Sequence, residues 1–205
     1  MTQAKKLILL LSLAALAGCA TPATEHYYRL AYTGSAADQA PSEATSAAIK
    51  YELIVDSVRI PDAINRPQLV MQKSATESSI SDDQRWVAPL DELITQAVVA
   101  NLRSPLPDAW LATGVSAGAA AGPGLPRYHL KIQVEQLLIQ GGETVALAAT
   151  WTLQDGSRKM LRRERTVINV PIHGPGYEPV APAVSEAVQQ LSAVIAKGMQ
   201  AVRPL

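Results

Sequence analysis

Cys19 is the only cysteine in the 205-residue chain, and its thiol is the side chain with the clearest capacity for chemistry. A catalytic thiol needs a basic or positively charged neighbour that favours the thiolate, and the sequence around Cys19 offers none. A structural zinc site needs further cysteine or histidine ligands at fixed spacing, and the chain has no second cysteine. The sequence therefore favours a third use, in which the thiol is a point of attachment.

The residues before Cys19 have the three-part layout of a secretory signal peptide. A basic end at Lys5 and Lys6 is followed by an apolar run over 7–16 and by two small residues. The apolar run is too short to span a bilayer, so it is typical of an exported chain and not of a membrane helix. We predict that 1–18 are removed as a signal peptide.

The four residues LAGC at 16–19 resemble the lipobox of bacterial lipoproteins. The resemblance implies cleavage directly before Cys19, a diacylglycerol on its sulfur and an acyl chain on its new amino group. Each buried methylene contributes ~0.8 kcal/mol, so two or three chains make a lasting anchor. Ala20 and Thr21 stand where lipoproteins kept at the inner membrane typically carry Asp, which favours the outer membrane, facing the periplasm. An ordinary secretory signal with an unrelated cysteine is the alternative.

The other side chains that commonly perform chemistry are dispersed. The histidines lie on a candidate N-terminal strand, on a polar strand face and in a Gly-Pro loop, at His26, His129 and His173. They show neither metal-ligand spacing nor a Ser-His-Asp arrangement, and the scattered carboxylates form no obvious acid/base pair. We expect ordinary surface or turn histidines, no metal, no cofactor beyond the lipid on Cys19, and no enzymatic activity.

The charge balance excludes one class of partner and leaves one basic cluster to explain. Without 1–18 the chain carries 16 basic and 18 acidic side chains, a balance that does not predict nucleic-acid binding. The cluster consists of Arg158, Lys159, Arg162, Arg163 and Arg165. Strand alternation divides it between both faces of a strand. It either keeps an edge strand from pairing with other sheets or, through Arg162 and Arg163, contacts an acidic partner surface or lipid headgroups.

Three more candidate partner contacts lie close to prolines. Arg66 precedes Pro67, where its donors either fix a turn or face a partner. Arg85 and Trp86 stand just before a helix that begins with a proline. A tryptophan at such a place is typical of a packing anchor and also of an interface.

Alternation and turn residues indicate several strands. The expected strands cover 26–32, 50–61, 66–72, 77–81, 128–134, 145–153 and 158–170, with a short segment at 110–111. Runs rich in Ala, Ser, Gly and Pro at 34–48 and 112–126 favour a flexible connection and a mobile loop. Asp155-Gly156 is a strong signal for a two-residue hairpin turn.

Two segments have apolar residues at helical spacing. The first begins near Pro89, with acids in its first turn, and ends before Pro105. The second covers 180–199. One-sided helices and a sheet with a polar face predict an α+β fold: a mixed, mainly antiparallel sheet with two amphipathic helices packed on one face. The expected division is a signal peptide (1–18), a lipidated N-terminus with a short strand and a flexible segment (19–48), and one domain (49–205).

Several short motifs occur in one order and carry a family resemblance. They are YYRL at 27–30, VRIP at 58–61, RPQLV at 66–70, RWVAPL at 85–90 and NL at 101–102, after the lipobox. Together they resemble the ABC-type transport auxiliary lipoprotein family. Two departures are Ala88, where we expect an acid, and the pair Ala63 and Ile64, which replaces an aromatic-leucine pair.

The resemblance implies a non-enzymatic component of the cell envelope. Such lipoproteins act with MCE-domain proteins or ABC-type lipid transporter subunits and help lipids cross the periplasm. This chain would dock that assembly at the outer membrane, with a homo-oligomer as one form. The alternative is a periplasmic lipid-binding carrier with a hydrophobic groove, which a lipid-sized apolar cavity would favour and a filled core would disfavour.

Overall fold

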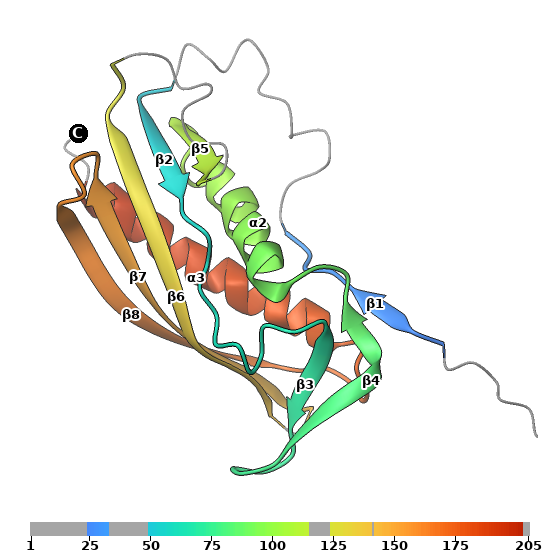
Figure 1. Ribbon diagram of the computed structural model, residues 1–205. Helices are drawn as coiled ribbons and strands as arrows, with labels where there is room; N and C mark the ends of the chain where they lie inside the picture. Colours follow the sequence, from blue (N-terminus) through green and yellow to red (C-terminus); the bar gives the residue numbers. More distant parts are fainter. Residues whose placement is uncertain (1–23, 33–48, 115–123, 141, 203–205) are drawn as a thin grey trace, which may run out of the picture.

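A computed structural model describes residues 24–32, 49–114, 124–140 and 142–202. This part of the chain forms an eight-stranded sheet with two long helices (Figure 1). The strands are β1 (His26–Tyr28), β2 (Tyr51–Val55), β3 (Gln68–Gln72), β4 (Ser78–Trp86), β5 (Ala109–Thr113), β6 (Arg127–Gln140), β7 (Thr144–Asp155) and β8 (Met160–Pro171). The helices are α2 (Leu90–Arg103) and α3 (Val180–Val202).

Strand β6 organises the sheet. Along one side it pairs antiparallel with β7, which pairs antiparallel with β8. Along the other side β6 pairs in parallel with β2 near its start and with β3 at Gln140. Strand β5 continues the sheet beyond β2, and β4 and β1 continue it beyond β3. The sheet is therefore mixed, and its long ladders are antiparallel.

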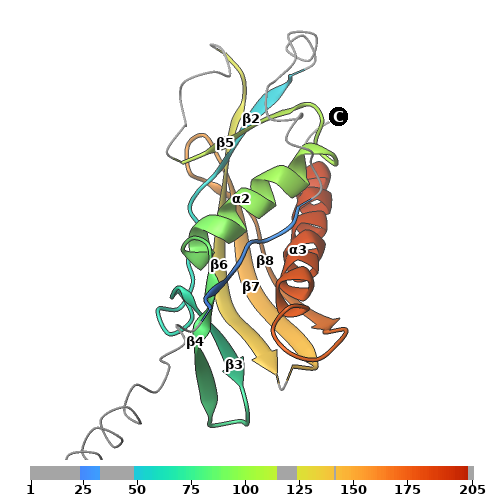
Figure 2. The same cartoon turned by 90° about the vertical axis from the view of Figure 1, so that its right-hand side faces the viewer.

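The two helices cover the apolar side of this sheet. Helix α3 packs on β7 and β8, and α2 packs beside α3 and against β5 (Figures 1 and 2). At Gly198 of α3 a Cβ atom would lie 2.3 Å from Cη2 of Trp151, so the helix approaches β7 closely there. The prediction of an α+β fold is confirmed. We call the face of β6–β8 opposite α3 the outer face.

Helix α2 begins and ends as the sequence predicts. Pro89 occupies its N-cap position, and Asp91 and Glu92 lie in the first turn, where acidic side chains complement the helix dipole. Arg103 lies in the last turn, and Pro105 follows shortly after. The fixed start of α2 matters because its first turns form one wall of the site described below.

A bulge in β6 keeps apolar side chains in the core beyond the predicted alternation. The register of the β6–β7 ladder shifts between Val134 and Gln136, so Glu135 has no cross-strand partner. As a result Leu137 and Ile139 are buried, although strict alternation from Val134 would place them on the outer face. The bulge also turns the carboxylate of Glu135 toward β7 and β8.

The turn between β7 and β8 differs from the predicted two-residue hairpin. The loop covers 156–159, and Arg158, not Gly156, has positive φ, at 67°. One carboxylate oxygen of Asp155 accepts hydrogen bonds from the backbone of Ser157 and Lys159. These local bonds stabilise a longer loop than the Asp-Gly pair suggests.

Other strand ends also differ from the expectation. The segment predicted as a strand over 50–61 leaves the sheet after Val55 and returns only as a bridge at Arg59. The strand expected at 77–81 extends to Trp86, because β1 and β3 pair with its second half. The short segment at 110–111 is the middle of β5, which pairs with β2.

Candidate functional site: a charged hollow on the outer face

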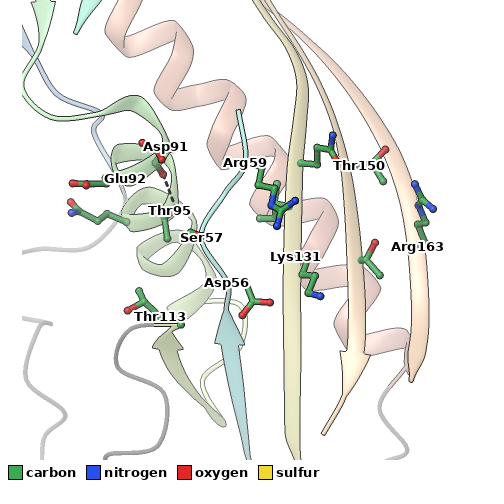
Figure 3. A pocket seen from close by; sticks show the side chains of 15 residues that line it. Asp56, Ser57, Arg59, Asp91, Glu92, Thr95, Thr113, Lys131, Thr150 and Arg163 are labelled. Carbon is green, nitrogen blue, oxygen red and sulfur yellow. Dashed lines mark hydrogen bonds between the residues drawn. The ribbon is translucent and has the colours of Figure 1, made fainter. Parts of the chain in front are cut away.

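A hollow of about 720 Å³ lies between α2 and the outer face of β6–β8 (Figure 3). Residues 56–59, which connect β2 to the turn before β3, run between these two walls. This segment is held on both sides: the Asp56 amide donates to the Leu130 carbonyl of β6, and the Val58 amide donates to the Thr95 hydroxyl of α2. The hollow is thus formed by elements distant in sequence and fixed by hydrogen bonds.

The sheet wall of the hollow is built by cross-strand register. Lys131 of β6 lies opposite Thr152 of β7, and Thr152 lies opposite Arg163 of β8. In the same way Arg59 forms a bridge with Gln133 of β6. Residues that are directly opposite in a sheet have neighbouring side chains on one face. Register therefore brings the cations Arg59, Lys131 and Arg163 to one hollow.

These three cations differ from two other arginines nearby. Arg165 Nε lies 2.7 Å from a Glu135 carboxylate oxygen, and Arg158 lies 3.5 Å from Asp56. Arg59, Lys131 and Arg163, by contrast, form no ion pair with any residue that the structure describes. All three side chains are exposed to solvent.

The Glu135 carboxylate already accepts hydrogen bonds from two neighbouring side chains. Hydrogen bonds from Thr150 and Arg165 hold the pKa of the Glu135 carboxyl below its ordinary value. The carboxylate is therefore ionised at neutral pH and neutralises Arg165. Glu135 therefore forms its ion pair with Arg165 and not with Arg59, Lys131 or Arg163.

The opposite wall of the hollow is acidic. It is the first two turns of α2, with Asp91, Glu92, Thr95 and Gln96. The Thr95 hydroxyl donates to the Asp91 carbonyl, while Oδ1 of Asp91 is buried without a hydrogen-bond partner. Glu92 is exposed. Carboxylates thus line the hollow at Asp56 and Asp91, whereas the Glu92 carboxylate extends from α2 away from the sheet wall (Figure 3).

His129 lies near one end of this region and is buried, in contrast to the surface position expected from its place on a polar strand face. Its side chain is 8% exposed, and Nδ1 lies 3.9 Å from an Asp56 carboxylate oxygen, beyond hydrogen-bond range. Burial and the nearby Arg158 guanidinium lower the pKa of His129, although Asp56 opposes them. The imidazole is therefore neutral at neutral pH.

The structure separates the predicted contacts Arg162 and Arg163. Arg162 lies on the helix-facing side of β8, 5.7 Å from the ring centre of Trp151 and 2.7 Å from a carboxylate oxygen of Glu164. Arg163 lies on the outer face and lines the hollow. The predicted division of the basic cluster between two faces is confirmed. In the described sheet β8 pairs only with β7, so β8 is an edge strand there.

Arg66, Arg85 and Trp86 come together at the β3–β4 end of the sheet. Arg66 is half-buried, and Trp86 is buried in the core, where its ring is a packing anchor. Arg85 is partly exposed, with Nε 3.1 Å from a carboxylate oxygen of Glu25. Cys19 lies outside the residues that the structure describes.

The part of the chain that the structure describes shows neither a candidate metal site nor a membrane-spanning helix. No group of three or more His, Cys, Asp or Glu side chains there is arranged to hold a metal ion. None of the helices formed by these residues has the length and apolar character needed to cross a bilayer.

Comparison with known proteins identifies the family. The sequence profile described as "ABC-type transport auxiliary lipoprotein component" matches residues 28–196, most of the chain. The chain belongs to this family. The intermembrane transport lipoprotein PqiC of Escherichia coli (strain K12) is 28% identical over 117 residues, as is that of Shigella flexneri. The match covers 57% of this chain and 59% of each relative.

Two solved structures share the fold of this family member. A crystal structure of an uncharacterized protein has a TM-score of 0.66 at 20% identity and covers 86% of this chain and 99% of its own. A protein from Xanthomonas campestris has a TM-score of 0.63 at 15% identity and covers 87% of this chain and 96% of its own. At these identities the likeness concerns the fold alone.

The family is described as one of auxiliary lipoprotein components of ABC-type transport, and it is not a family of enzymes. The hollow was not predicted as a site, because Arg59, Lys131 and Thr152 come from three separate segments. Alternation over 128–134 places Lys131 on a polar face, but nothing local in the sequence indicates which strands lie next to it.

Proposed function

We propose that this chain is a lipoprotein anchored through the acylated Cys19 in the outer membrane, facing the periplasm, where it docks MCE-domain or ABC transporter subunits that move lipids. Its family and the name of its Escherichia coli relative support a role in intermembrane transport. In this role the protein binds neighbours and catalyses no reaction. A homo-oligomer is one form that fits this role.

The docking role is supported by the packing of the interior, where apolar side chains fill the space between the sheet and the helices. Between the sheet and the helices the described side chains form one continuous apolar core, in which Trp151, Leu153 and Leu191 are at most 1% exposed. The hollow on the outer face is lined mainly by polar and charged side chains. An acyl chain needs an apolar cavity, so the alternative of a lipid carrier with a hydrophobic groove gains no support from these residues.

A contact surface for a partner lies around Arg85. In the parallel β1–β4 ladder Tyr27 lies opposite Arg85, and the Val87 amide continues the ladder to the Tyr28 carbonyl. Tyr27 is 60% exposed and Val87 56%, whereas Tyr28 and Trp86 point toward the core. Exposed aromatic and aliphatic groups around an arginine are typical of interface centres.

The position of this surface suits a tethered protein. Seven residue steps separate Cys19 from His26 at the start of β1, and an extended chain of that length spans at most about 25 Å. An anchored Cys19 thus keeps His26 within this distance of the bilayer, and the Tyr27–Arg85–Val87 surface begins at the next residue along the chain. A partner that approaches the membrane meets it there.

Native extraction tests the docking role. The lipidated protein is extracted gently from membranes, and the proteins that co-purify with it are identified. We expect MCE-domain or ABC transporter subunits. Recovery of the protein alone, with one lipid bound per chain, would overturn the docking role in favour of the carrier.

Replacement of Tyr27 by Ser together with Val87 by Asp tests the contact surface. We expect recovery of the partner to fall about tenfold or more, because truncation of interface centres commonly costs 1–2 kcal/mol or more. Val167→Asp is the matched control, since Val167 is 55% exposed on β8, away from this surface. Equal recovery with both variants would contradict the assignment of the surface.

A further inference from the structure

The carboxylate of Asp56 lies between two basic side chains at the edge of the hollow that it lines (Figure 3). Its Oδ2 lies 3.5 Å from Nη1 of Arg158, in the loop between β7 and β8. Its Oδ1 lies 3.9 Å from Nδ1 of His129 on β6, which is beyond hydrogen-bond range. At neutral pH Asp56 is therefore paired with Arg158 and faces a neutral imidazole that it does not bind.

The neutral form of His129 leaves buried polar atoms unpaired. Nδ1 of His129 has no hydrogen-bond partner among the described residues, and neither has Oε1 of Gln154, which lies opposite His129 on β7. Buried polar atoms are normally hydrogen-bonded, so two unpaired atoms on neighbouring residues indicate a second bonding state of this cluster. A protonated imidazole carries a donor on each nitrogen, so it can donate from Nδ1 to the Asp56 carboxylate.

Two arginines lie close to His129, and they are held to different degrees. Arg127 on β6 is bound by Glu52 of β2, with 2.6 Å between Nε and a carboxylate oxygen, and the Glu52 side chain is only 2% exposed. The Arg158 side chain is 53% exposed, and an ion pair in such a position contributes little to stability. A positive charge on His129 repels both guanidinium groups, and Arg158 is the one that can move into solvent.

We propose that protonation of His129 exchanges the partner of Asp56, so that the imidazolium binds the carboxylate and the Arg158 guanidinium is released into solvent. The proton comes from the solvent, and only hydrogen bonds and ion pairs change. Burial and then Arg158 lower the pKa of His129, so the exchange takes place in mild acid, below about pH 6.5. Return to neutral pH restores the Arg158 pair. The device is an acid-operated switch that adds a free guanidinium to the surface beside the hollow.

Nuclear magnetic resonance of the full-length lipidated protein in a non-ionic detergent tests this exchange between pH 7 and pH 5. The Cε1–H resonance of His129 reports its protonation, and the Nε–H resonance of Arg158 reports the mobility of its side chain. We expect both signals to change with one midpoint, below pH 6.5, and Arg158 to be mobile on the acid side. His129→Gln should abolish the pH dependence of the Arg158 signal. His173→Gln is the matched control and should leave it unchanged.

Asp56→Asn provides the reference for the released state. Without the carboxylate, Arg158 should be mobile at neutral pH already, and the midpoint of His129 should fall because a neighbouring negative charge is lost. The proposal is overturned if Arg158 stays immobile while His129 becomes protonated, or if acid releases Arg158 equally in His129→Gln. It is also overturned if the amide resonances show loss of the fold before His129 takes up a proton.

Discussion

At the scale of single residues, the least expected finding is a buried histidine beside an ion pair. His129 lies near Asp56, Arg158, Arg127 and Glu52, and burial and the arginines outweigh the carboxylates in lowering its pKa. Glu52, which is 2% exposed, is itself neutralised by Arg127 Nε at 2.6 Å. Unpaired burial of a charge is costly, so the protein keeps His129 neutral.

The lowered pKa of His129 predicts an acid-sensitive fold. In the unfolded chain a histidine takes up a proton below about pH 6.5, whereas folded His129 resists protonation until lower pH. The unfolded state then binds more protons, so this group makes the free energy of unfolding fall as pH drops below about 6.5. We expect His129→Gln to lose less stability than the unaltered protein between pH 7 and pH 5, as measured by urea unfolding.

His173→Gln is the control for this prediction. His173 is exposed in the loop before α3, so its replacement should leave the pH dependence of unfolding unchanged. Identical pH profiles for His129→Gln and the unaltered protein would show that other groups govern acid sensitivity.

At the scale of elements, the contact of α3 with β7 fixes the helix that covers the apolar side of the sheet. Gly198 lets the helix backbone approach the Trp151 ring, whose Nε1 donates to the Thr166 hydroxyl on β8 at 3.3 Å. The ring is also covered by Arg162 at the sheet edge. A single aromatic side chain thus joins α3, β7 and β8.

Gly198→Ala should destabilise the protein although alanine favours helices. The added Cβ would lie 2.3 Å from Cη2 of Trp151, and overpacking of this kind costs about 1–3 kcal/mol. This cost is at least as large as the ~1 kcal/mol by which alanine exceeds glycine in helix propensity. Thermal or urea unfolding measures the difference.

A second substitution tests the cause of this loss. Phenylalanine lacks the Cη2 atom, so Gly198→Ala should cost less in a Trp151→Phe background than in the unaltered protein. Equal costs in both backgrounds would attribute the effect to something other than the helix–ring contact.

At the scale of the whole molecule, the two faces of the sheet differ in character, and the proposed lipid anchor at Cys19 adds a third feature. The apolar face carries the helices and the core, and the outer face carries the charged hollow. The proposed partner surface lies at the β1–β4 end, which the chain joins to Cys19 by a short connection.

Two substitutions at the N-terminus test the anchor and its destination. Cys19→Ser should move the protein from the membrane fraction to the soluble periplasmic fraction, because no acyl chains hold it. Ala20→Asp should shift the lipidated protein from the outer to the inner membrane on a density gradient, as expected for the residue after a lipidated cysteine. Mass spectrometry that shows a free thiol and an intact 1–18 segment in the natural product would refute the anchor.

The sequence by itself determined the features that depend on neighbours along the chain. Proline and acids mark the start of α2, apolar residues at helical spacing define both helices, and alternation gives the two faces of β6–β8. The motif order also indicated the family. Only the tertiary structure decided which strands are neighbours. A period of two residues says which face a side chain occupies but not what lies beside it, so the meeting of Arg59, Lys131 and Arg163 and the burial of His129 arise from strand order and register.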